Sequence, residues 1–151
     1  MTDPADATEA LVTLQTRLID AGEGYAEGAK RAKRADDPTM TRILQELRAL
    51  HTTHAATLSA TLMARGVEPD ADGSFLQHIH KAVISVRSAL GALGESAMPG
   101  VRDGEERFLS LYDDTLNLAS SDAEVVALLE TQRREVSEAI DLMRAIEAAV
   151  G

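Results

Sequence analysis

The sequence predicts an all-α fold, and three observations support that prediction. The 151-residue chain contains 25 Ala and 18 Leu against 9 Val and 6 Ile; Ala and Leu favour helices, whereas β-branched residues favour strands. Apolar residues recur every three or four positions, which is the helical period. Four prolines, at positions 4, 38, 69 and 99, divide the chain into helix-sized segments, because proline breaks a helix interior. This length is typical of a single domain, expected here over residues 1–151.

The first two helices are expected over residues 5–35 and 38–65. Asp3 and Asp37 each precede a proline, which is the pattern of an N-cap residue followed by proline at the first helical position. Gly66 follows the second helical pattern and opens a segment, 66–73, with the composition of a loop. Because the first connection is very short, these two helices should be antiparallel neighbours.

Three further helices are expected over residues 74–93, 98–119 and 122–149. Ser74 with Gln77, and Ser121 with Glu124, match the capping-box pattern at a helix N-terminus. The last two helices should also be antiparallel neighbours, since only a short connection separates them. The helix at 74–93 can then serve as a crossover.

Composition and charge exclude several classes of function. Fifteen Lys and Arg against 25 Asp and Glu give a net charge of −10, which argues against a nucleic-acid partner. The absence of cysteine excludes disulfides, thiolate metal sites and cysteine nucleophiles. No segment reaches the roughly 18 apolar residues of a membrane span, and the N-terminus has no export signal. We therefore expect a cytoplasmic protein with no membrane partner.

Polar residues on the inward faces of the helices are the candidates for a site. His51 and His54 both fall within the apolar stripe of the second helix, Glu105 lies close to the stripe of its helix, and Gln132 points inward. Two imidazoles three residues apart can share a metal ion or a proton network, and imidazoles with a carboxylate suit zinc, iron or manganese. The alternative is a pair of buried histidines that hydrogen-bond to Glu105, Gln132 or a tyrosine.

Other residues have simpler interpretations. Tyr25 and Tyr112 occupy stripe positions, where core packing with a partner for each hydroxyl is expected. Asp20 should lie nearly opposite the stripe of the first helix. The basic run at residues 29–34 favours the C-terminal end of a helix dipole; an anion-binding or subunit-contact patch is the alternative. The pair at 78 and 80 reads as surface or boundary histidines.

Several short motifs, spread over nearly the whole chain, support a resemblance to a known family. They are residues 18–29 (LIDAGEGYAEGA), Gly66-Val67-Glu68-Pro69 with Gly73-Ser74, Leu76 and His80, and Gly104-Glu105-Glu106 with Tyr112. Together they resemble a bacterial ferritin-like family of unknown function whose members are described as four-helix-bundle proteins. The resemblance implies a ferritin-like four-helix bundle with the helix at 74–93 in the crossover between the second and third core helices. It implies no activity.

The same resemblance bears on metal binding. Metal-loaded ferritin-like proteins hold two irons with one Glu from each of two helices and a Glu-x-x-His pair from each of the other two. Here His54 matches a histidine position, His51 stands where the Glu belongs, and Glu105 is the candidate for a third-helix Glu. The first and last helices present no matching carboxylate, so the resemblance implies an incomplete di-iron ligand set.

Two functions follow from these observations. The first is a non-catalytic role in association or structure, in which the protein forms a homodimer or binds an unidentified protein partner. On this hypothesis no enzyme activity and no cofactor are expected. The alternative is a metal-binding bundle with a degenerate site at His51, His54 and Glu105, with Gln132 as a possible further ligand for iron, zinc or manganese.

Overall fold

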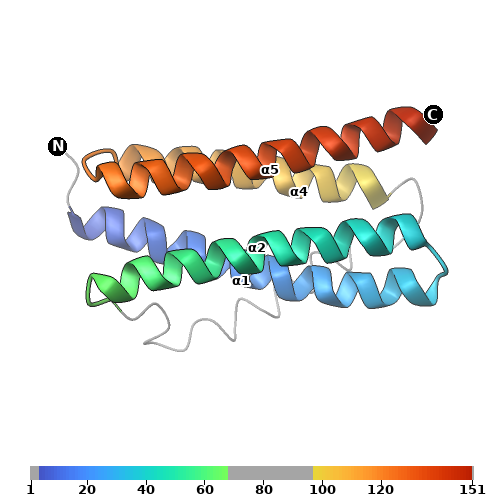
Figure 1. Ribbon diagram of the computed structural model, residues 1–151, viewed down its shortest axis with the longest axis horizontal. Coiled ribbons are helices and arrows are strands. Elements are labelled where there is room, and N and C mark those ends of the chain that lie inside the picture. Colours follow the sequence, from blue (N-terminus) through green and yellow to red (C-terminus); the bar gives the residue numbers. More distant parts are fainter. Residues whose placement is uncertain (1–3, 68–96, 151) are drawn as a thin grey trace. The chain divides into compact units, whose positions relative to one another are not determined.

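The computed structural model describes residues 4–67 and 97–150, which contain four α-helices and no strand (Figure 1). The helices are α1 (Pro4–Arg34), α2 (Pro38–Ala64), α4 (Ala97–Leu118) and α5 (Ala123–Val150). The all-α prediction is confirmed for the described residues, and all eight boundaries of these four helices agree with the expected ones to within one residue. The expected helix at 74–93, its capping box, the histidines at 78 and 80 and the cap residue Asp3 lie outside the described residues.

The chain divides into two compact units. The α4–α5 unit consists of Met1–Leu14 with Arg102–Gly151, and the α1–α2 unit consists of Gln15–Val101. The first part of α1 therefore belongs to the α4–α5 unit, and the first residues of α4 belong to the α1–α2 unit. Each unit is described by itself below.

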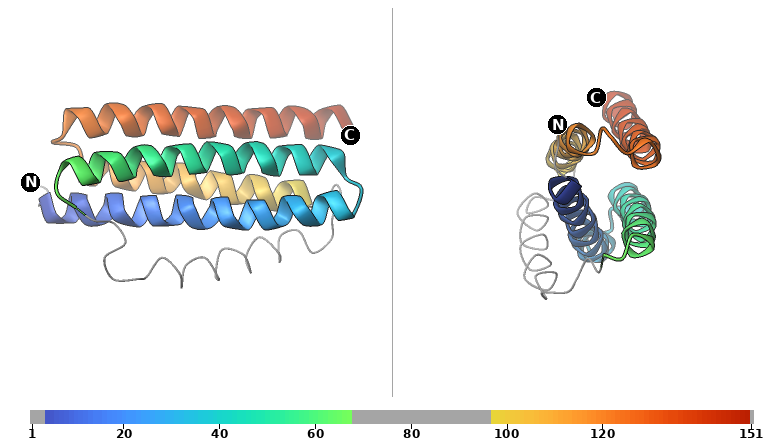
Figure 2. Two further views of the ribbon diagram at one scale, coloured as in Figure 1. Left: turned by 60° about the horizontal axis from the view of Figure 1, so that its bottom comes forward. Right: turned by 90° about the vertical axis from the view of Figure 1, so that its left-hand side faces the viewer.

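In the α1–α2 unit, the two helices run antiparallel and side by side (Figures 1 and 2). The turn between them is closed by Asp36, whose φ of 59° is left-handed. The amide of Asp36 donates to Lys33 O and that of Asp37 to Ala32 O, the two hydrogen bonds that end a helix in a Schellman motif. Asp37 then caps α2, as predicted, by accepting a hydrogen bond from the Met40 amide at 3.1 Å.

The two helices of this unit approach closely at Gly22. A Cβ there would lie 3.1 Å from Thr52 Oγ1, a contact so tight that the threonine side chain would have to shift by a few tenths of an ångström. The core on either side is formed by leucines with at most 3% of their surface exposed: Leu18, Leu44, Leu47, Leu58 and Leu62. Burying each such side chain contributes about 1.5–3 kcal/mol relative to leaving it in water.

Ion pairs join the two antiparallel helices of the α4–α5 unit along their exposed sides. Arg133 binds both carboxylate oxygens of Asp113, at 2.7 and 3.1 Å. Two further pairs join Arg144 to Glu106 and Arg102 to Glu147. The earlier an ion-pair residue lies on α4, the later its partner lies on α5. This is the antiparallel register expected for two helices joined by a short turn.

The N-terminus of α5 differs from the predicted capping box. Asp122, one residue later than Ser121, accepts a hydrogen bond from the Val125 amide at 3.2 Å. An aspartate at this position satisfies a helical amide and also places a negative charge at the positive end of the helix dipole. The capping role predicted for Ser121 is therefore wrong by one residue.

The position predicted for Asp20 is also wrong. It was expected opposite the apolar stripe of its helix, yet only 6% of its surface is exposed. Thr16, Asp20, Gly24 and Gly28, four residues apart on α1, are all buried. The helix is thus buried on a second side, which the search for a single stripe did not reveal.

The length and apolar character of the described helices determine whether any of them could span a membrane. None of the four described helices combines the length and the apolar character that crossing a bilayer requires.

The cap of α2 provides a stability test. Asp37→Ala leaves the Met40 amide without its side-chain acceptor and should lower the free energy of unfolding by about 1 kcal/mol. Urea denaturation measures the change. Asp37→Asn keeps an acceptor oxygen and should cost clearly less, while Asp103→Ala, an exposed aspartate in α4, should change little. Equal losses for the Ala and Asn variants would contradict the capping role.

Candidate functional site

The two predicted histidines form a buried cluster in the α1–α2 unit. His51 is fully buried and His54 is 3% exposed, and their ring centroids lie 6.4 Å apart at an interplanar angle of 69°. Tyr25 of α1 stacks on His51 with centroids 5.9 Å apart and planes at 19°. The close approach at Gly22, one turn before Tyr25, allows the tyrosine ring to reach α2. The prediction that both histidines are buried on one face is confirmed.

A second polar cluster lies in the α4–α5 unit. Glu105 and Tyr112, two turns apart on α4, are both fully buried, and Gln132 on α5 is 2% exposed. The Tyr112 hydroxyl donates a hydrogen bond to Gln132 Oε1 at 2.9 Å. The sequence analysis expected partners for the tyrosine hydroxyls, and this contact supplies one for Tyr112.

The surroundings of Tyr112 keep its phenol neutral. Burial away from water raises its pKa above the ordinary tyrosine value, and the charges of Glu105 and Glu135 raise the pKa further. A phenol that keeps its proton remains a hydrogen-bond donor. Tyr112 therefore acts as a neutral link between α4 and α5.

The predicted metal ligands are divided between the two units of the chain. His51 and His54 group with Tyr25 in one unit, while Glu105 and Gln132 group with Tyr112 in the other. Across residues 4–67 and 97–150, no three His, Asp or Glu side chains are grouped so that they could hold a metal ion. The stacking of Tyr25 on His51 was not predicted. Its only sequence signal was that both residues occupy stripe positions in an antiparallel hairpin.

The sequence analysis also missed an open groove in the α4–α5 unit. It has a volume of about 320 Å³ and lies between the start of α1 and the second half of α4. Its lining consists of Asp6, Glu9, Ala10, Thr13, Leu111, Asp114, Thr115 and Leu118. Most of this lining is apolar, and the leucine at 118 is 37% exposed. The stripe analysis could not find the groove, because the groove depends on how two helices meet.

The charges along this groove are all negative. Asp6, Glu9 and Asp114 are exposed, and none of them forms an ion pair with another described residue. Among the described residues, no arginine or lysine belongs to the lining. The groove therefore combines apolar surface, which we call its floor, with carboxylates that form no ion pair with a described residue, which we call its border; we call the whole the acidic groove.

Comparison with known proteins gave one match. A family model described as a domain of unknown function (DUF2383) matches residues 6–118. No curated protein and no solved structure matches. The matched range includes both histidines, Glu105 and Tyr112, and it ends before Gln132.

The contact between Tyr112 and Gln132 is testable by substitution. Tyr112→Phe removes the donor to a buried amide oxygen and should lower the free energy of unfolding by about 1–2 kcal/mol. Because a buried pair can be replaced by two apolar groups at little cost, adding Gln132→Met should cost less than the sum of the two single substitutions. If the losses of unfolding free energy for the two single substitutions, measured by urea denaturation, add up to the loss for the double variant, the proposed coupling between Tyr112 and Gln132 is contradicted.

The raised pKa of Tyr112 adds a pH dependence to the same test. Above about pH 10 the unfolded chain loses the phenol proton that the folded chain retains, so stability present below that pH is lost as the pH rises. The stability difference between wild type and Tyr112→Phe should therefore narrow between about pH 9 and pH 11. A constant difference would show that the phenol ionises equally easily in both states.

Proposed function

The chain belongs to the family described as a domain of unknown function (DUF2383), and this description assigns no activity. We therefore propose, from the structure, that the protein is a non-catalytic helical protein. It acts by associating with another protein chain. In our proposal its helices form a ferritin-like four-helix bundle with residues 74–93 in the crossover. A ferritin-like fold does not imply ferritin-like chemistry, because function resides in the site and not in the fold.

The acidic groove is the observation that carries this proposal. A partner that covers the apolar floor removes it from water, which favours association. Leu118 contributes to that floor with more than a third of its surface exposed. The unpaired carboxylates at the border can select a partner by charge.

The buried polar clusters are consistent with a structural role. Tyr112 and Gln132 satisfy one another, and Tyr25 packs face to face on His51. These are contacts between helices of a single unit, and each joins two neighbouring helices. In this proposal they fix the packing of the core and carry no reaction.

Association is tested by placing a photo-cross-linking residue at Leu118 in the full chain, in cells, and identifying the adduct by mass spectrometry. We expect a specific adduct with one defined protein, either a second copy of the chain or a different one. The matched control is the same residue at Met63, which is 64% exposed on α2. Size-exclusion chromatography with light scattering measures self-association separately. A groove position that forms no more adduct than the control, in a chain that stays monomeric, refutes the proposal.

The second candidate function is metal binding, favoured by the burial of two imidazoles on one face of α2. His51 and His54 would be the ligands, with Glu105 and Gln132 added by the sequence hypothesis. Within the α1–α2 unit alone, the two imidazoles are fewer than the three or four protein ligands of a zinc site. Iron, zinc or manganese would be the candidate metals.

Metal analysis of protein purified without chelators decides between the two functions. A metal-binding protein should retain about one metal ion per chain, lose it with His54→Ala, and keep it with Glu46→Ala, an exposed carboxylate on the same helix. On our preferred proposal the wild-type chain should contain well below one metal ion. A stoichiometric metal that disappears only with His54→Ala would reverse that preference.

A further inference from the structure

We propose that the acidic groove binds the basic end of α1, residues 30–34, from a second copy of this chain. The inference rests on the proposed function and names the partner of its groove. The three carboxylates of the groove and the four cations of the basic end are the complementary charges.

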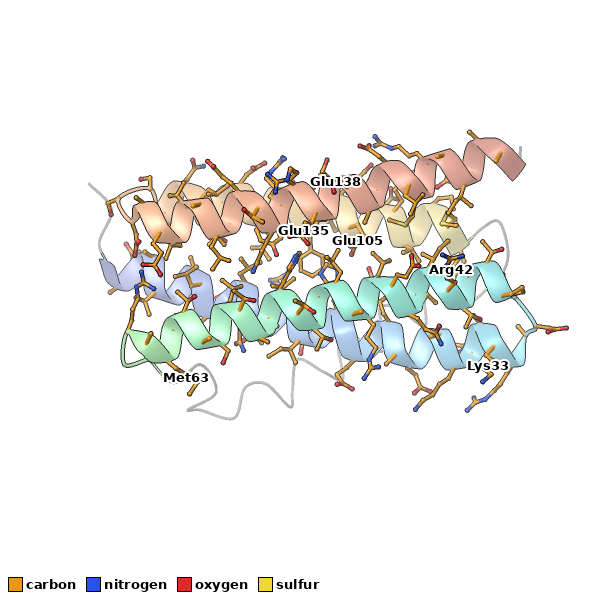
Figure 3. All side chains as sticks on the ribbon, viewed as in Figure 1. Lys33, Arg42, Met63, Glu105, Glu135 and Glu138 are labelled. Atoms are coloured by element: carbon orange, nitrogen blue, oxygen red, sulfur yellow. The ribbon has the colours of Figure 1, made fainter. Side chains whose placement is uncertain are left out.

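The basic end of α1 is an unusual concentration of charge in this protein. Lys30, Arg31, Lys33 and Arg34 are four of the 15 basic residues in the chain, and they lie within five positions. Lys33 and Arg34 are exposed, and Figure 3 shows Lys33 at the end of α1. Lys30 pairs with Glu27 of the same helix at 3.9 Å, and the remaining cations of the cluster are open to an anionic partner.

Several other arginines of the described residues form ion pairs with carboxylates on their own or a neighbouring helix. Arg133 pairs with Asp113 and Arg144 with Glu106 in the α4–α5 unit, and Arg42 pairs with Glu46 on α2. Lys33 and Arg34 form no ion pair with any described residue, as is also true of Arg17, Arg48 and Arg107, but only Lys33 and Arg34 lie next to each other in a cluster of cations. The groove carboxylates likewise form none. Two opposite charge clusters on the same chain are therefore left for contacts with another molecule.

The chemistry of lysine and arginine suits the floor of the groove as well as its border. Their long aliphatic stems cover apolar surface while the charged ends stay in water or meet a carboxylate. Stems lying across Leu111 and Leu118 would remove the apolar floor from water, and the charged ends would reach Asp6, Glu9 or Asp114. An acidic or purely apolar segment would achieve only one of these two contacts.

A second copy is the partner that carries this segment at the same concentration as the groove. Each chain has one acidic groove and one basic end, so every contact of this kind joins two different surfaces. Two such contacts related by a two-fold axis close a dimer, and contacts that do not close extend to larger oligomers. Another protein with a basic helix end is the competing occupant.

The experiment is sedimentation equilibrium of the full chain and its variants, from about 10 μM to about 1 mM. We expect wild type to self-associate at about 50 mM NaCl and to weaken about tenfold at about 500 mM, because the screening length falls from about 14 Å to about 4 Å. Lys33→Glu with Arg34→Glu should weaken association about tenfold. Glu9→Lys with Asp114→Lys should do the same.

The decisive variant combines all four reversals, which restores opposite charges with their places exchanged. It should recover wild-type association to within about threefold. Matched controls reverse exposed charges elsewhere with the same change in net charge: Arg42→Glu with Arg134→Glu for the basic end, and Glu46→Lys with Glu138→Lys for the groove. These controls should leave association within about twofold of wild type. Circular dichroism verifies that each variant retains its helices.

The outcomes separate this inference from the function it rests on. Self-association that both pairs of reversals leave unchanged overturns the inference while preserving association. A monomeric wild type whose groove cross-links to a different protein overturns it in the same way. Controls that weaken association as much as the test variants, or a fourfold variant that fails to recover, also overturn it. Recovery by charge exchange supports it.

Discussion

Each described helix buries one side in its unit, and that burial constrains every polar residue on the same side. A polar group removed from water must find a partner inside the protein or impose a free-energy penalty. Tyr112 meets this requirement through Gln132, at a pKa that keeps it a donor. Tyr25 and His51 stack their rings, which buries the ring faces against each other. The chemistry available in the interior is therefore limited to what neighbouring helices supply.

Charged residues on the outside divide into two populations. Between α4 and α5, arginines and carboxylates pair along the whole antiparallel register, from Arg133 with Asp113 to Arg102 with Glu147. These exposed or half-exposed pairs contribute little stability individually, but they fix which charges are already satisfied. The acidic groove and the basic end of α1 remain outside this network. That division is the surface feature on which the proposed association role rests.

The residues of the candidate site show where prediction from sequence succeeds. Helical periodicity placed His51, His54, Glu105 and Gln132 on inward faces, and all four are buried. Periodicity is reliable here because a 100° step per residue fixes the direction of each side chain around its own helix axis. It does not say which residues of another helix lie opposite. The stack of Tyr25 on His51, and the division of the four residues between two units, followed only from the packing.

By itself the sequence determined the helices, their boundaries and the cap at Asp37, because these depend on residues a few positions apart. It misplaced the cap of α5 by one residue, since Ser121 and Asp122 both have side chains that can accept the hydrogen bond and the local pattern does not choose between them. Only the tertiary structure decided that Asp20 is buried on a second side of α1, and that α1 and α4 leave an acidic groove between them. Both features depend on the spacing and register of segments far apart in the sequence, and no local pattern encodes these quantities.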